Sequence, residues 1–373
     1  MIRCADAAGY EARYPRWNDW KRQYANRLTT AGEIAGFLGM TEHQKQDVAK
    51  CLSSFRMAVT PYYASLINPD DPDDPIRRVC VPDIQETYPC GNDMADPLGE
   101  VDDSPVPHIV HRYPDRVLFL VTLCCSTYCR YCTRRRVVGE EDRVITEPEL
   151  QTALGYVREH KEIRDVLISG GDPLTMATPK LEHIIAELRA IPHVDIIRIG
   201  TRVPVVLPMR ITDELLSMLK KYQPVWINTH FAHPNEITPE SQRACEAIVD
   251  AGIPLGDQTV LLNGINNNTA TMKELMLKLV HMRVRPYYLY QCDLSRGIGH
   301  FRTTVDQGVN IIHDLTGNIS GYAVPKFVID APGGGGKVPI NYNYVISKND
   351  REVVMENFQG KTYRYPQPAP AKK

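Results

Sequence analysis

Several features that would place this chain in a membrane or on a nucleic acid are missing from its 373 residues. No run of 18 apolar residues occurs, and the opening Met1-Ile-Arg-Cys-Ala-Asp lacks the apolar stretch of a secretory signal. The formal net charge is only -2 and Phe occurs only 7 times, which disfavours an RNA-binding surface of basic and stacking aromatic residues. We therefore expect a cytoplasmic protein with no nucleic acid and no membrane as partner.

Cysteine, by contrast, is plentiful. Ten cysteines in a chain expected to be cytoplasmic indicate metal or redox chemistry before disulfides. Hydrophobic residues make up 43% of the chain, enough for a large core, and the length suits two to three domains or one α/β barrel with additions. Six cysteines are isolated in the sequence and are expected to be inert thiols: Cys4, Cys51, Cys80, Cys90, Cys245 and Cys292.

Between about residues 116 and 316, short apolar runs alternate with helical patterns at a period near 30 residues. This alternation is typical of βα units in a parallel sheet, and six units predict a partial (β/α)6 barrel. Thr146-Glu-Pro-Glu149 is a predicted capping box, and Thr178-Pro179 opens another predicted helix. The predicted strands are Arg116–Val121, Asp165–Ile168, Asp195–Ile199, Val225–Asn228, Leu255–Leu261 and Arg285–Tyr290.

The chain is expected to divide into three regions. Residues 1–107 are predicted to be helical and then irregular, with a loop at Asn68–Pro75. Residues 108–316 form the predicted barrel. Residues 317–373 add a strand at Lys326–Asp330, a four-glycine run and a short frayed tail.

Three cysteines stand at C-x3-C-x2-C spacing: Cys125, Cys129 and Cys132. Such thiolates can hold three irons of a cubane 4Fe-4S cluster and leave the fourth iron open to a small molecule. The alternatives are a zinc site or unrelated buried thiols, but structural zinc usually takes two pairs of ligands, and Cys124 is poorly placed as a fourth. The spacing, and its position after an apolar strand, resemble the radical S-adenosylmethionine (SAM) superfamily, whose open iron binds SAM.

Polar residues follow or end the predicted strands repeatedly, where α/β barrels carry their chemistry, and Gln258 lies within the fifth strand. We therefore predict one active-site mouth. The residues concerned are Ser169-Gly-Gly-Asp172, Thr201-Arg202, His230, Gln258 and Gln291-Cys-Asp293.

The tripeptide Gly170-Gly171-Asp172 allows a ligand to approach the backbone closely, and Asp172 can accept hydrogen bonds from an ammonium group. A glycine turn between strand and helix explains the tripeptide equally well. Radical SAM proteins carry a GGE-like motif here that contacts the methionyl amino group, so the resemblance favours SAM binding by all three residues. His230, Gln258 and Tyr290 are further candidates for cofactor binding.

The second unusual segment is Asp330-Ala-Pro-Gly-Gly-Gly-Gly-Lys337. A Walker A phosphate loop is excluded, because Ala331 stands where the first glycine should be and Val338 follows the lysine. The residues alone favour a surface glycine linker, although a lysine on such a loop could form a Schiff base with pyridoxal phosphate (PLP).

Taken together, six motifs resemble the lysine 2,3-aminomutase family over roughly residues 15 to 365. The resemblance implies an isomerase that interconverts L-lysine and L-β-lysine with a 4Fe-4S cluster, SAM and PLP. The motifs are the cysteines in a CTRRR setting, HRYPDR at His111–Arg116, SGGD at Ser169–Asp172, HP-NEIT at His233–Thr238, QCDLS at Gln291–Ser295 and DAPGGGGK at Asp330–Lys337.

The resemblance also implies roles for single residues. Lys337 matches the lysine that carries PLP. A guanidinium fork suits a phosphate dianion, and Arg112, Tyr113 and Arg116 match the residues that hold the PLP phosphate.

Arg134 matches the clamp for the substrate carboxylate in this family. Asp293 and Asp330 match the two carboxylates that receive the ε-ammonium of lysine. L-arginine, also cationic, stays open as the alternative substrate, whereas a glutamate-using relative would need cationic or amide residues there.

One departure concerns zinc, which family members hold with a cysteine in the loop after the fifth strand and a C-terminal cysteine cluster. That loop reads Asn266-Asn267-Asn268 here and the sequence shows no such cluster, so zinc is not predicted and the zinc-linked subunit contact is in doubt. We still expect a homo-oligomer, a small-molecule amino acid substrate, and an electron donor such as flavodoxin or ferredoxin. Two rivals remain: a methylthiolating type of radical SAM enzyme without PLP, and a zinc-structured RNA-binding module.

Overall fold

A mixed sheet forms the centre of the computed structural model, which describes residues 16–139 and 142–368. Within those residues, nine strands of this sheet pair in chain order from β1 to β9. The strands from β2 to β8 run parallel, and both edge strands are antiparallel to their neighbours. The strands are β1 Ile109–Tyr113, β2 Arg116–Thr122, β3 Asp165–Gly170, β4 Ile196–Gly200, β5 Val225–Thr229, β6 Leu255–Leu261, β7 Arg285–Gln291, β8 Lys326–Ala331 and β9 Gly336–Pro339.

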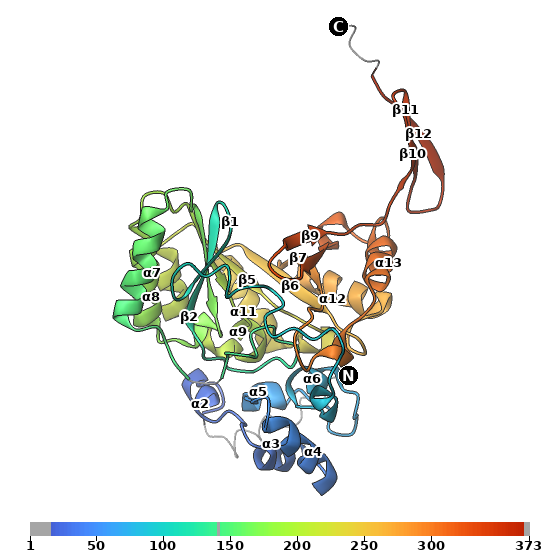
Figure 1. Cartoon of the computed structure of the whole chain (residues 1–373). Helices are drawn as coiled ribbons and strands as arrows, with labels where there is room; N and C mark the ends of the chain where they lie inside the picture. Colours follow the sequence, from blue (N-terminus) through green and yellow to red (C-terminus); the bar gives the residue numbers. More distant parts are fainter. Residues whose placement is uncertain (1–15, 140–141, 369–373) are drawn as a thin grey trace.

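Helices alternate with the parallel strands and lie on the outside of the sheet (Figure 1), which confirms the predicted partial barrel. The predicted capping box is present, since the Thr146 N–H donates to the Glu149 carboxylate at 2.9 Å. Leu181, Ile184, Ile185 and Leu188 bury the apolar stripe of α8. The helices are α7 Glu147–Glu159, α8 Thr178–Arg189, α9 Val203–Val206, α10 Asp213–Lys220, α11 Pro239–Asp250, α12 Thr269–His281 and α13 Val305–Leu315.

The first described helices pack against the loop that follows β2. The Tyr128 N–H donates to the Ala58 carbonyl at 2.9 Å, and the Arg130 N–H donates to the Val79 carbonyl at 2.8 Å. The helical region (Figure 1, blue) therefore covers the loop after β2 that carries the cysteines. No helix within the described ranges is long and apolar enough to cross a bilayer. These helices are α2 Trp20–Ala25, α3 Ala31–Leu38, α4 Glu42–Leu52, α5 Pro61–Ala64 and α6 Pro75–Cys80.

Two strands that the sequence did not predict complete the sheet. Strand β1 contains the first half of the His111–Arg116 motif and turns into β2 through Pro114-Asp115. Strand β9 begins inside the glycine run, whose residues hid the strand pattern, and pairs with β8 in a register that sets Lys337 opposite Asp330. The glycine-rich segment is thus the turn of a β-hairpin and not a surface linker.

A separate three-stranded antiparallel sheet, which was not predicted, stands away from the barrel (Figure 1, red). It comprises β10 Val345–Lys348, β11 Glu352–Glu356 and β12 Thr362–Pro366, and all of its side chains are at least partly exposed. Most of the predicted tail, residues 369–373, and Cys4 lie outside the described residues. The division of the chain at residues 107 and 316 stays a prediction.

Candidate functional site

A cavity of about 790 Å³ lies within the partial barrel and reaches the loops at the C-terminal ends of its strands. Parallel strands bring these loops to one rim, although the residues are far apart in sequence. Of the residues that the sequence placed at the mouth, Gln291 and Cys292 do not line this cavity. Every residue that the sequence assigned to a cofactor or the substrate does line it: Cys125, Cys129, Cys132, Arg112, Tyr113, Arg116, Gly170, Gly171, Asp172, His230, Gln258, Tyr290, Arg134, Asp293, Asp330 and Lys337.

The three cysteines lie in the loop that follows β2. Burial, followed by the nearby charge of Asp172, raises the pKa of the Cys125 thiol well above its usual range, and burial together with Cys129 raises the pKa of Cys132 to about 11. These thiols therefore need a strong positive charge to ionise, which iron supplies. In the described part of the chain, no three His, Cys, Asp or Glu side chains are gathered around one metal position. In a cubane cluster each thiolate binds an iron of its own, and this donor set fits that group.

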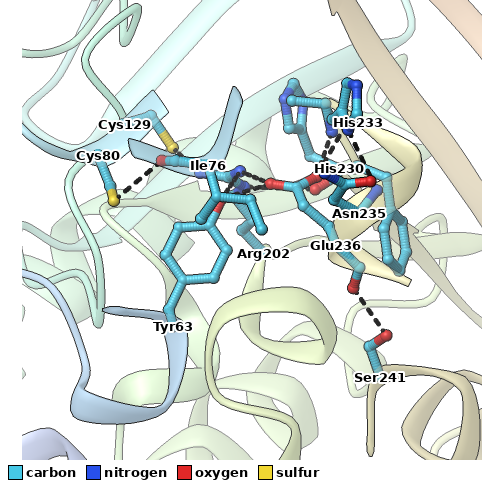
Figure 2. Close-up of polar contacts among 12 residues, drawn as sticks. Tyr63, Ile76, Cys80, Cys129, Arg202, His230, His233, Asn235, Glu236 and Ser241 are labelled. Atoms are coloured by element: carbon cyan, nitrogen blue, oxygen red, sulfur yellow. Dashed lines mark hydrogen bonds and ion pairs between the residues drawn. The ribbon is translucent and has the colours of Figure 1, made fainter. Parts of the chain in front are cut away.

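The Arg202 side chain connects the cysteine loop to two other parts of the chain (Figure 2). Its Nη1 donates to Cys129 Sγ at 2.8 Å, and its Nη2 donates to Glu236 Oε1 at 2.5 Å and to the Tyr63 hydroxyl at 3.0 Å. Glu236 is fully buried within the HP-NEIT motif. A donor to a cluster sulfur is one means by which a protein sets the cluster's reduction potential. The sequence placed Arg202 on the rim without assigning it these partners.

His230 follows β5 beside this network, and its Nε2 lies 2.5 Å from the Tyr131 hydroxyl. Burial and the Arg202 charge lower the pKa of His230 to about 3. The ring is therefore neutral at physiological pH, with Nε2 hydrogen-bonded to a phenol.

The glycines of Gly170-Gly171-Asp172 are required by the protein's own backbone. A Cβ on Gly170 would lie 2.1 Å from the Thr122 carbonyl oxygen, and one on Gly171 would lie 2.2 Å from that of Cys124. Steric conflict within the protein thus accounts for both glycines.

The Asp172 carboxylate already accepts hydrogen bonds from the Thr201 hydroxyl at 2.6 Å, the Arg202 N–H at 2.7 Å and the Leu174 N–H at 3.1 Å. It therefore ties together the loops that follow β3 and β4. Its expected contact with the SAM ammonium stays a prediction.

Lys337 projects from β9 beside Asp330. Its Nζ lies 3.1 Å from Asp330 Oδ1 and 5.3 Å from the centre of the Tyr290 ring. Its backbone N–H donates to the Tyr113 hydroxyl at 2.9 Å, so the lysine is joined to the His111–Arg116 motif. An amine at the wall of a cavity that Tyr290, Arg112 and Arg116 also line fits PLP as a covalent partner.

Two arginines of the same motif line the cavity with Lys337. Arg112 Nε donates to Asp103 Oδ2 at 2.7 Å, and its Nη2 donates to the Leu98 carbonyl. The Arg116 guanidinium lies 3.9 Å from the centre of the Tyr113 ring. These guanidinium groups fit a phosphate dianion. Sequence reasoning missed Leu98 and Asp103, because the irregular segment around them shows no periodic pattern.

The predicted substrate residues bring opposite charges into the cavity. Arg134 Nε and Nη2 donate to Glu100 Oε1 at 2.9 and 2.5 Å, a partner that the sequence did not reveal. Burial and the neighbouring Asp330 raise the pKa of Asp293 to about 7, while Lys337 opposes this effect. Two carboxylates therefore share one region of low polarity, where a further cation would relieve their repulsion.

The asparagines at the position of the family's zinc loop have structural roles. Asn266 is buried, accepts from the Leu262 N–H at 2.8 Å and donates to the Ala232 carbonyl at 2.8 Å. Asn267 accepts from the Gly264 N–H, and Asn268 caps α12. The absence of zinc stays a prediction.

Comparison with known proteins identifies the family. A family model described as "Lysine-2,3-aminomutase" matches residues 312–373, and one described as "Radical SAM superfamily" matches residues 119–276. The L-lysine 2,3-aminomutase of Clostridium subterminale is 55% identical over 94% of this chain and 85% of its own length. That of Bacillus subtilis is 52% identical over 95% and 75%. The glutamate 2,3-aminomutase of Clostridioides difficile is 45% identical over 93% and 82%.

These matches extend over nearly the whole chain and favour the aminomutase reading over the methylthiolating and RNA-binding alternatives. Radical SAM membership brings a 4Fe-4S cluster and SAM, and the aminomutase branch depends on PLP. The chain belongs to the lysine 2,3-aminomutase family of radical SAM isomerases.

Proposed function

We propose that this protein interconverts L-lysine and L-β-lysine by moving the α-amino group to C3. The observation that carries the proposal is the juxtaposition of Asp293, Asp330 and Lys337 in the cavity that the three cysteines also line. An acidic pair next to a reactive amine selects an amino acid with a distal cation. The same chemistry on L-arginine is the second candidate.

Family-level chemistry divides the work between cofactors and protein. When bound, the cluster with SAM supplies a carbon radical that can remove hydrogen from C3, and PLP supplies a π-system that delocalises the rearranging radical. Cys125, Cys129 and Cys132 would hold the cluster, while Gly170, Gly171, Asp172, His230, Gln258 and Tyr290 would contact the cofactors.

The chain's own residues then fix the remaining geometry. Lys337 would hold PLP covalently, and Arg112, Tyr113 and Arg116 would hold its phosphate. With PLP bound, Lys337 Nζ would no longer serve as the counter-ion of Asp330, and the substrate ε-ammonium could take that place. Arg134 would bind the carboxylate at the opposite end. Fixing both ends leaves C3 in one place, which is the protein's main contribution to such a reaction.

The negative charges of this site also disfavour glutamate as the substrate. A distal carboxylate placed near Asp293 and Asp330 would add a third negative charge to a buried region. Repulsion between like charges at a buried site costs several kcal/mol, which would weaken the binding of glutamate on the order of a thousandfold.

We further propose a homo-oligomer in the cytoplasm that receives electrons from a flavodoxin or ferredoxin. The β10–β12 sheet supports the oligomer, because Tyr363 and Tyr365 are 52% and 64% exposed in the single chain. Small sheets of this kind rarely persist without a packing partner. The free thiols in the described ranges suit a reducing compartment.

The test is an anaerobic assay of the reconstituted protein with SAM and a reductant, offered L-lysine, L-arginine and L-glutamate in parallel. Formation of β-lysine at the highest kcat/KM supports the proposal. Preferential turnover of arginine or glutamate would refute the lysine assignment.

A further inference from the structure

The segment Asp96–Asp103 joins three parts of the cavity wall that the proposed function assigns to different groups. The Gly333 N–H donates to the Pro97 carbonyl at 3.0 Å, which ties the segment to the turn that precedes Lys337. A Cβ on Gly99 would lie 3.0 Å from the Gly334 nitrogen, so the two backbones are in close contact. The segment's acidic side chains then hold Arg112 and Arg134.

Within this segment Glu100 is buried and contacts Arg134 through both oxygens of its carboxylate. Arg134 Nε lies 2.9 and 3.2 Å from the two carboxylate oxygens, and Nη2 lies 2.5 Å from Oε1. The Glu100 side chain is 8% exposed. Such a contact occupies the Nε edge of the guanidinium and fixes the plane of the group, because guanidinium and carboxylate forks are both planar.

A guanidinium carries five N–H donors, and the Nε edge uses two of them. The two Nη1 protons and the second Nη2 proton stay available to a second carboxylate. Resting on the proposed function, we propose that Glu100 is a positioning residue that orients Arg134 so that its remaining edge binds the α-carboxylate of the substrate.

The burial of the pair explains why an acid is used for this purpose. Without Glu100, Arg134 would be a partly buried, unpaired cation in the same cavity as Asp293 and Asp330, the carboxylates proposed for the ε-ammonium. Glu100 keeps the Arg134 cation paired at one end of the site, so that Asp293 and Asp330 at the other end are not neutralised by Arg134. Removing it would therefore weaken recognition of the carboxylate end.

The experiment compares two ligands that differ only in the carboxylate: L-lysine and 1,5-diaminopentane. Each is titrated into the anaerobic protein with the cluster oxidised, and binding is followed by the change in visible absorbance of PLP. The dissociation constant of 1,5-diaminopentane divided by that of L-lysine measures how much the carboxylate contributes to binding. We expect Glu100→Ala to lower this ratio roughly 10- to 100-fold, with diaminopentane affinity little changed. Glu100→Gln, which keeps the shape and one acceptor, should fall between Ala and the unchanged protein.

Arg136→Gln serves as the matched control. Arg136 Nη2 approaches Glu100 Oε2 at 3.4 Å and Asp96 at 3.4 Å without contacting the proposed clamp edge. For Arg136→Gln, the ratio of dissociation constants should stay within about twofold of the value for the unchanged protein. PLP and iron contents are measured in each variant, and the isosteric Gln variant keeps the test valid if the Ala variant does not fold.

Two outcomes overturn the inference. The ratio stays constant in both Glu100 variants while Arg134→Gln collapses it, or the ratio rises because Glu100 competes with the substrate for Arg134. If Arg134→Gln leaves the ratio unchanged as well, the proposed carboxylate clamp itself is wrong, which separates failure of the function from failure of this inference.

Discussion

Replacing either acidic residue at the proposed ammonium site should strongly reduce turnover of lysine. Asp330 is nearly buried, with 7% of its side chain exposed, and lies 3.1 Å from Lys337 Nζ. Asp293 lies close enough for Asp330 to raise its pKa. When the lysine amine is engaged elsewhere, the substrate ε-ammonium is the natural counter-ion for both carboxylates.

The magnitude follows from the burial of the pair. Truncating one partner of a buried, hydrogen-bonded charge pair costs about 2–5 kcal/mol, which corresponds to roughly 30- to several-thousand-fold. We expect Asp293→Asn and Asp330→Asn each to lose kcat/KM for L-lysine in this range. The asparagine keeps the side-chain volume, so the loss reports charge and not a cavity.

The assay measures β-lysine formation in proteins whose iron and PLP contents match those of the unchanged protein. L-norleucine, which lacks the ε-amine, is the control ligand, and its binding to the PLP site should be unchanged or tighter in the variants. Near-native kcat/KM for lysine in both variants would show that these residues do not recognise the substrate.

Three further outcomes are expected. Cys129→Ala should abolish SAM cleavage and Cys124→Ala should retain the cluster, so full cleavage by the Cys129 variant would remove the cluster assignment. Borohydride reduction followed by peptide mapping should place the pyridoxyl group on Lys337, and a label on Lys326 instead would exclude Lys337 as the PLP-bearing residue. Lysine binding should weaken as pH falls below about 7, because burial raises the pKa of Asp293 to about 7 and protonation removes the negative charge that attracts the ammonium. If Asp293→Asn shows the same pH profile, Asp293 is not the group that causes it.

The barrel was predictable because its strands are buried and flanked by amphipathic helices. Strand β6 matches the predicted Leu255–Leu261, and the other predicted strands agree within two residues at each end. Strands β1 and β9 were missed, because one is a short edge strand and the other starts in glycine. The β10–β12 sheet escaped prediction since its strands carry no buried face to impose a pattern.

The candidate site was predictable where a motif or a resemblance marked a residue, and not where a residue acts only through contacts. Glu100 and Asp103 lie in an irregular segment, and only the fold shows that they hold Arg134 and Arg112. Glu236 belonged to a recognised motif, yet its pairing with Arg202 depends on loops from different strands. The close backbone contacts at Gly170 and Gly171 likewise required coordinates, since a glycine pair in sequence does not reveal what it approaches.

The most direct test of the central claim follows the nitrogen during turnover. The anaerobic protein, reconstituted with iron, sulfide, PLP and SAM and then reduced, is incubated with L-lysine carrying ¹⁵N at the α position and ¹³C at C3. The account predicts ¹⁵N bonded to ¹³C3 in L-β-lysine, seen as a one-bond coupling by NMR, and only when SAM and the reductant are both present. Recovery of lysine without this coupling, alongside rearrangement of arginine or glutamate under the same conditions, would contradict it.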